Sequence, residues 1–136
     1  MPARYLLDTN ICIYIRARRP PAIRARFEKL EPGEAALSVI TYGELLFGAE
    51  KSEDRPLSMR RLAELSSAIP VLSLPDGAAQ TYGAIRAALE PKGRMIGNND
   101  LWIAAHARAS GLVLVTNNER EFRRVPGLKI ENWAAG

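Results

Sequence analysis

The chain has 136 residues, a length that suits one domain with its own hydrophobic core. Its composition, 47% hydrophobic and 25% charged, excludes a disordered or collagen-like chain. No apolar run approaches the roughly 20 residues of a membrane-spanning helix, and the first residues lack the apolar core of a signal peptide. The single Cys12 cannot form an internal disulfide. We therefore expect one domain over residues 1–136, located in the cytoplasm.

The charge balance is basic, with 19 Lys and Arg against 15 Asp and Glu and a formal net charge of +4. The arginines gather mainly at 16–26, 60–61 and 120–124. Because the planar guanidinium matches phosphate geometry, a phosphate-bearing partner is one interpretation of these clusters. Solvated helix faces are the other.

Short apolar runs alternate with helical patterns along the chain, and proline and glycine residues separate them. In chain order we expect a strand over 5–7, helices over 10–18 and 22–30, a strand over 35–40, helices over 41–51 and 56–68, and a strand over 71–74. The second half continues with a helix ending near 90, a polar loop over 91–99, a helix over 100–110 capped by Asn98 or Asn99, a strand over 112–115, a short helical turn ending near 122 and a strand over 128–130.

Three of these helices have a recognisable start. Thr41 and Glu44 fit a capping box, in which a hydroxyl and a carboxylate satisfy the first free N–H groups of a helix. Thr116 and Glu119 fit a second capping box, for the short helical turn. Asp76 is the expected cap of the helix that ends near 90.

Each expected strand is a continuous apolar run, and helices separate the strands. This pattern is typical of an α/β fold with a parallel sheet covered on both faces. Ligands of such sheets bind beyond the carboxyl ends of the strands, where the strand order reverses. The residues that directly follow the strands are therefore the candidates for a functional site.

Acidic and other oxygen-bearing side chains lie at these positions. Asp8 follows the first strand, Glu44 lies shortly after the second, and Asp100 begins the helix before the fourth. The fourth strand is followed by a polar cluster, Thr116, Asn117, Asn118 and Glu119. Mg²⁺ and Mn²⁺ prefer oxygen ligands, so this edge of the sheet is a candidate site for a divalent cation.

The helix pattern around Asp100 strengthens this interpretation. At about 100° per residue, Asp100 shares a helix face with Ile103, Ala104 and Ala107. A carboxylate above an apolar face is partly desolvated and needs a cation or several hydrogen-bond donors. Gathered carboxylates also repel one another and raise one another's pKa values, and a divalent ion relieves both effects.

Each acid also has a purely structural interpretation. Asp8 fits a turn or a helix cap, Glu44 fits the third position of a capping box, and Asp100 is favoured by the helix dipole. Glu119 fits a cap better than a metal ligand. The other side chains that could support chemistry or stacking are expected to pack in the fold, and these are Cys12, Trp102, His106 and Trp133.

Four segments together resemble the PIN-domain ribonucleases, in particular the VapC-type toxins of bacterial toxin–antitoxin modules. They are LLDTNICIYI, SVITYGELLFGAEKS, GNNDLWIAAHARASGLVLVTNN and EFRRVPGLKIENW. The resemblance implies a PIN-like three-layer α/β/α sandwich with a central parallel sheet. It also implies an endoribonuclease that depends on Mg²⁺, acts as the toxin of a type II module, and is inhibited by a cognate VapB-like antitoxin. Members that end like this chain resemble those that cut transfer RNA in the anticodon stem-loop.

Carried over by position, Asp8, Glu44 and Asp100 match the first three acidic residues of the family. Thr9 matches the hydroxyl after the first acid, and Thr116 the hydroxyl that ends the fourth strand. We therefore expect Asp8, Asp100 and Glu44 to serve the metal, with Thr9 and Thr116 in support.

The chain departs from the family pattern at Asn118, where many PIN domains have a fourth acid. An amide can orient a water but adds no charge, which puts a second metal ion in doubt. We expect Asn118 to act with the three acids in catalysis, and either Glu119 or Glu121 to be the residue that could compensate for the missing charge.

A receiver-like signalling domain with an acidic Mg²⁺ pocket is the alternative hypothesis. Such a domain needs a phosphoaccepting Asp after a middle strand and a Lys after a late one, and the polar cluster at 116–119 contains no Lys. A homodimer is also expected, because the predicted helices over 41–51 and 56–68 carry more apolar side chains than one thin sheet covers. These are Leu45, Leu46, Phe47, Leu57, Met59, Leu62 and Leu65.

Overall fold

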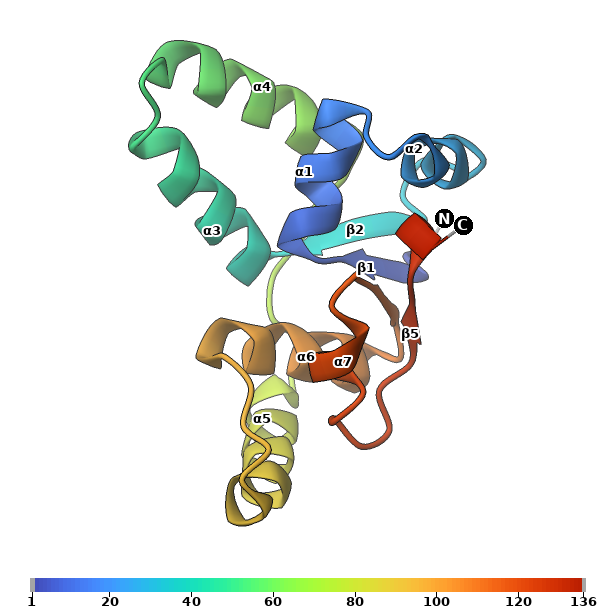
Figure 1. Cartoon of the computed structure of the whole chain (residues 1–136), viewed down its shortest axis with the longest axis vertical. Helices are drawn as coiled ribbons and strands as arrows, with labels where there is room; N and C mark the ends of the chain where they lie inside the picture. The colour runs from blue at the N-terminus through green and yellow to red at the C-terminus, as the bar shows by residue number, and fades with distance from the viewer. Residues whose placement is uncertain (1, 136) are drawn as a thin grey trace.

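Five parallel strands form one sheet, in the order β3-β2-β1-β4-β5, in the computed structural model, which describes residues 2–135 (Figure 1). In chain order the elements are β1 (Tyr5–Leu7), α1 (Thr9–Ala17), α2 (Pro21–Glu28), β2 (Ala35–Ser38), α3 (Val39–Glu50), α4 (Arg55–Ala68), β3 (Val71–Leu72), α5 (Ala78–Leu89), η1 (Glu90–Lys92), α6 (Asn98–Ser110), β4 (Val113–Val115), α7 (Glu119–Phe122), β5 (Ile130–Glu131) and η2 (Trp133–Ala135).

Helices cover both faces of the sheet, because alternate residues of each buried strand point to opposite sides. Tyr5 and Leu7 pack into a core with α1, α2, α3 and α4, whereas Leu6 packs into a second core with α5, α6 and α7. Figure 1 shows the first group of helices above the sheet and the second group below it. The predicted α/β class and the three-layer α/β/α arrangement are confirmed.

The strand register places the ends of the three central strands side by side. Leu7 of β1 pairs with Leu37 of β2 on one side and with Val115 of β4 on the other. The residue that follows Leu7 is Asp8, and its N–H donates to the Val115 carbonyl at 3.0 Å. The strand order reverses between β1 and β4, so Asp8 lies at the switch point where ligands of such sheets bind.

The predicted capping box at Thr41 and Glu44 is wrong. Ser38 ends β2 and caps α3, since its hydroxyl accepts a hydrogen bond from the Ile40 N–H at 3.2 Å. The Ser38 hydroxyl is also 2.9 Å from Nδ1 of His106. Thr41 therefore lies inside the helix, fully buried, and its hydroxyl oxygen has no hydrogen-bond partner. The strand predicted over 35–40 ends earlier for the same reason.

Three other predicted helix starts are also wrong. Gly77, with φ of +89°, precedes α5 in place of Asp76, and Gly97 precedes α6, which already contains the asparagines expected to cap it. The Thr116 hydroxyl donates to the Asp8 carboxylate, so Thr116 does not pair with Glu119 in a capping box. The two edge strands, β3 and β5, are shorter or displaced by a residue or two from the predicted ranges.

The side chains expected to pack do so. Cys12 and His106 are buried, and Trp133 is buried edge-on against the Tyr5 ring, 5.3 Å between centroids. Trp102 stacks on Tyr82 at 4.0 Å. Among the described residues, no helix has the length and apolar character that crossing a membrane requires.

Candidate active site

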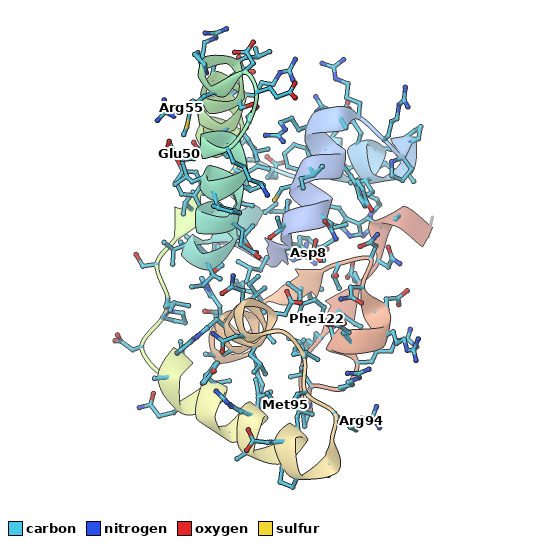
Figure 2. All side chains as sticks on the ribbon, turned by 60° about the vertical axis from the view of Figure 1, so that its left-hand side comes forward. Asp8, Glu50, Arg55, Arg94, Met95 and Phe122 are labelled. Carbon is cyan, nitrogen blue, oxygen red and sulfur yellow. The ribbon has the colours of Figure 1, made fainter. Side chains whose placement is uncertain are left out.

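A polar cavity of about 190 Å³ opens at the carboxyl ends of β1 and β4. Its lining contains five of the six side chains that the sequence singled out, and the sixth, Thr116, lies directly behind Asp8. The lining residues are Asp8, Thr9, Asn10, Glu44, Asp100, Asn118 and Phe122. Figure 2 shows Asp8 at the base of α1 and Phe122 on α7, close to the centre of the molecule.

Asp8 is the most buried acid of the cavity and is held from two sides. Its Oδ1 accepts the Ile11 N–H at 2.9 Å, which caps α1, and its Oδ2 accepts the Thr116 hydroxyl. Burial raises the pKa of Asp8 and the charge of Glu44 raises it further, although the hydrogen bonds from Thr116 and Ile11 act in the opposite direction. The structure therefore combines both interpretations of Asp8, since it is a helix cap that also faces a polar cavity.

Glu44 reaches the cavity from α3 and is fixed by neighbours from two other helices. Its Oε1 accepts the Thr9 hydroxyl at 2.6 Å, and its Oε2 accepts the Asn99 amide at 3.4 Å. Thr9 belongs to α1 and Asn99 to α6, so the carboxylate connects the helices that carry Asp8 and Asp100. This contact with Asn99 has no signal in the sequence, because the two residues are far apart along the chain.

Asp100 lies in the first turn of α6, half-buried. Burial raises its pKa to about 6, and the negative charges of Glu44, Glu121 and Asp8 contribute to the same shift. The expected desolvation and mutual repulsion of the acids are both present. Glu121, on α7, adds a fourth negative charge near the cavity although it does not line it.

Asn118 and Glu119 are consecutive residues at the start of α7, but only Asn118 lines the cavity. The Asn118 N–H donates to the Thr116 hydroxyl oxygen at 2.9 Å, and its side chain lines the cavity. The Glu119 carboxylate instead accepts the Asn132 amide at 3.0 Å and pairs with Arg123 at 2.9 Å, outside the cavity. Of the two residues considered as replacements for the missing acid, Glu121 is therefore the one whose charge reaches the site.

The donor set fits a hydrated divalent ion. Asp8 and Asp100 both have raised pKa values, and a cation would neutralise the charge that their burial makes costly. In residues 2–135, no three carboxylate, thiolate or imidazole groups converge to hold a metal by themselves. Mg²⁺ usually takes only one or two carboxylates and keeps several waters, which matches two acids around a small polar cavity.

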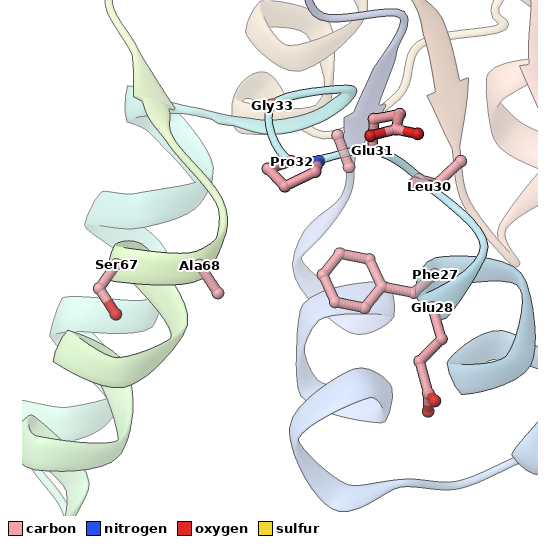
Figure 3. Close-up of a pocket in the computed structure, with 9 residues that line it drawn as sticks. Phe27, Glu28, Leu30, Glu31, Pro32, Gly33, Ser67 and Ala68 are labelled. Atoms are coloured by element: carbon pink, nitrogen blue, oxygen red, sulfur yellow. The ribbon is translucent and has the colours of Figure 1, made fainter. Parts of the chain in front are cut away.

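A larger cavity, of about 360 Å³, lies elsewhere in the molecule (Figure 3). Phe27, Leu30, Pro32 and Ala68 line it, and it borders Ala35, the first residue of β2. It therefore lies toward the amino end of the sheet, away from the cavity that contains Asp8. Its lining is mainly apolar and holds no residue of the predicted site.

The parallel sheet and the acids at its switch point fit a PIN domain, and sequence comparison shows that family. Residues 5–128 match the PIN domain. The chain belongs to the PIN-domain family and, within it, to the VapC-type ribonucleases.

Ribonuclease VapC2 of Haemophilus influenzae is 45% identical over 130 residues, which cover 96% of this chain and 98% of the relative. The tRNA(fMet)-specific endonuclease VapC of Shigella flexneri is 44% identical, with the same coverage of both chains. The crystal structure of DNA-bound VapBC from Salmonella typhimurium aligns with a TM-score of 0.90 at 43% identity, covering 96% of this chain and 98% of the matched chain.

Proposed function

We propose that this protein is the toxin of a type II toxin–antitoxin module and cleaves RNA as an endoribonuclease that depends on Mg²⁺, or on Mn²⁺ in its place. One observation carries the proposal: Asp8 and Asp100, both with raised pKa values, line one polar cavity at the switch point of a PIN-domain sheet. The family match leaves the receiver-like alternative without support. That alternative also needs a phosphoaccepting Asp after a middle strand, whereas Asp76 follows β3, which lies at the edge of the sheet.

The chain's own residues divide the work at the phosphodiester. Asp8 and Asp100 would hold the cation, with Glu44 as the third acid of the site. When bound, Mg²⁺ lowers the pKa of a water and neutralises charge that develops on the phosphate. The Asn118 amide, which lines the cavity, would orient the attacking water, and Thr9 and Thr116 would keep the carboxylates of Glu44 and Asp8 in position through their hydrogen bonds.

Two of the relatives support transfer RNA as the substrate, since they are named tRNA(fMet)-specific endonucleases. We infer that this chain also acts on transfer RNA, and we propose that it cuts within the anticodon stem-loop. We propose that one domain over residues 1–136 carries this activity and that it acts in the cytoplasm.

The partner proposed for this chain is a small VapB-like antitoxin. Several matched structures are VapBC complexes, from Rickettsia felis, Salmonella typhimurium and Haemophilus influenzae. A homodimer is proposed as well, on the apolar side chains that α1 and α3 leave exposed.

The proposal is tested by incubating the purified protein with total RNA in Mg²⁺, in Mn²⁺ and in EDTA, and by sequencing the new 5′ ends. We expect cleavage at a few sites with either metal and none in EDTA. Asp8→Asn serves as the inactive control. Cleavage that persists in EDTA, or in the Asp8→Asn protein, would show a contaminating nuclease or a different site.

A further inference from the structure

A second cavity, of about 220 Å³, adjoins in sequence the polar cavity that contains Asp8, which we call the catalytic cavity. Phe122 lines the catalytic cavity, and Arg123 lines the second one. The residues that line the second cavity include no carboxylate, and four of them are cationic. We call these four the basic cluster, and they are Lys92, Arg94, Arg123 and Arg124.

Most of this positive charge is not neutralised within the protein. Arg123 pairs with Glu119 at 2.9 Å, across a largely exposed surface. In the part of the chain that the structure describes, Lys92, Arg94 and Arg124 form no ion pair. Several like charges around one small cavity create a positive potential that favours a polyanion.

The loop that carries half of the cluster is held in place by the backbone. The Arg94 N–H donates to the Leu89 carbonyl at 3.1 Å, and Gly93 takes up a φ of +63° that suits glycine. The Arg124 guanidinium donates to the Met95 carbonyl at 3.0 Å, which joins this loop to the segment after α7. The backbone that carries the basic cluster, and the Arg124 side chain, are therefore fixed before any ligand binds, which lowers the entropic cost of binding.

Both segments of the basic cluster lead directly into the catalytic cavity. The loop with Arg94 and Met95 continues into the first turn of α6, where Asp100 lies, and Arg123 follows Phe122. In Figure 2, Arg94 and Met95 lie on the loop below Phe122, and Asp8 lies above it. A nucleic acid strand bound at the carboxylates would pass the basic cluster with its flanking nucleotides.

We propose that the basic cluster binds backbone phosphates of the RNA substrate on one side of the cleaved bond. This inference rests on the proposed function. Arginine suits this task because its planar fork matches phosphate oxygens, and phosphate contacts fix the position of a nucleic acid without reading its bases. Lys92 and Arg94 are thus positioning residues, which set the affinity for RNA and not the choice of sequence.

Binding is measured without cleavage in Asp8→Asn protein, with a fluorescein-labelled RNA stem-loop as the probe. The test variant adds Lys92→Gln and Arg94→Gln, which change two exposed side chains. The slope of log affinity against log salt should become shallower by about 1.4, since each lost single-strand phosphate contact removes roughly 0.7. The control variant instead adds Lys29→Gln and Arg60→Gln, which remove the same charge from exposed positions elsewhere in the chain. Its salt slope should stay close to that of the Asp8→Asn protein.

The second readout is cleavage, measured with the same substitutions in protein that keeps Asp8. Lys92→Gln with Arg94→Gln should raise KM for the stem-loop several-fold and leave kcat nearly unchanged, whatever the loop sequence. An equal loss in the control, an unchanged salt slope, or lower kcat at constant KM would overturn the proposal. So would weaker binding of a DNA duplex with RNA binding unchanged. If the wild-type protein cleaves no RNA, the proposed function fails, and the salt slope still tests the cluster.

Discussion

Burial and hydrogen bonding act in opposite directions on the Asp8 carboxylate. Desolvation raises its pKa, while the Thr116 hydroxyl and the Ile11 N–H stabilise the charged form. Because the net direction is upward, these donors do not fully replace the lost water. Burial and the charges of Glu44, Glu121 and Asp8 raise the pKa of Asp100 to about 6. At the scale of single residues, the buried carboxylates of Asp8 and Asp100 are unfavourable in their charged form, and a bound cation would stabilise that form.

Replacing Asp8 by Asn should abolish cleavage while the fold persists. The amide oxygen can still accept the Ile11 N–H that caps α1, but it cannot bind a cation as a carboxylate does. We expect the cleavage rate to fall at least about 100-fold, because mutating even a residue that only hydrogen-bonds to a metal ligand typically lowers metal affinity or activity 10- to 100-fold. Thermal unfolding in EDTA should show a melting temperature equal to or above that of the wild type. Near-wild-type cleavage at saturating Mg²⁺ would contradict the assignment.

The raised pKa of Asp100 predicts a pH dependence of stability in the metal-free protein. Its carboxyl titrates near 6 in the folded state and near the usual 3.8 when unfolded, so folding favours the protonated form. The stabilising contribution is complete below about pH 4 and is lost as the pH rises through about 6. We expect Asp100→Asn to remove this loss, so that its advantage over the wild type grows across that range.

Urea unfolding in EDTA at several pH values measures this difference between the two proteins. Adding Mg²⁺ at neutral pH provides the control, because an ion that binds only the folded state stabilises the wild type by about 2.7 kcal/mol at a hundred times its Kd. The Asp100→Asn protein should gain much less. Parallel pH profiles for the two proteins would refute the assigned pKa shift.

At the scale of elements, the strands and their parallel arrangement were predictable because each strand is a continuous apolar run that can be recognised in the local sequence. Asp8 was also a predictable cap of α1, but several other helix starts were not predictable. Ser38 displaces Thr41 as the cap of α3 because Ser38 also contacts His106, a partner from α6. Thr116 is likewise taken by Asp8, from the opposite end of the chain. The acids of the site could be predicted from their places after the strands, whereas the neighbours that hold them depend on tertiary contacts.

Ser38→Ala should destabilise the protein by about 1–2 kcal/mol. The change removes the α3 cap, which typically costs about 1 kcal/mol, and leaves the buried Nδ1 of His106 without its partner. Urea unfolding at neutral pH measures the loss. Ser67→Ala on α4 is the matched control, since its exposed hydroxyl bonds only within its own helix, and it should stay within about 0.5 kcal/mol of the wild type. Equal effects of the two substitutions would rule out a special role for Ser38.

At the scale of the whole molecule, the two cores cover nearly all large apolar side chains. Leu45, Leu62 and Leu65, which the sequence left without an obvious cover, are buried against the sheet. Among residues 2–135, three large apolar side chains remain exposed, and all lie on α1 and α3: Ile13, Val39 and Phe47. The apolar surface that favours a dimer is therefore narrower than the sequence indicated, and it lies mainly on α3.

Phe47 is the side chain on which a homodimer would depend most. It is 66% exposed, and the Lys51 ammonium lies over its ring, 4.7 Å from the centroid. An aromatic side chain of this size gains most from burial at the centre of an interface. Light scattering should give a dimer mass for the wild type at high micromolar concentration, without antitoxin, and a monomer mass for Phe47→Asp. Ala84→Asp, an equally charged change on the exposed side of α5, should leave the dimer intact. A monomeric wild type would refute the homodimer. A Phe47→Asp protein that remains a dimer would show that the interface does not depend on Phe47.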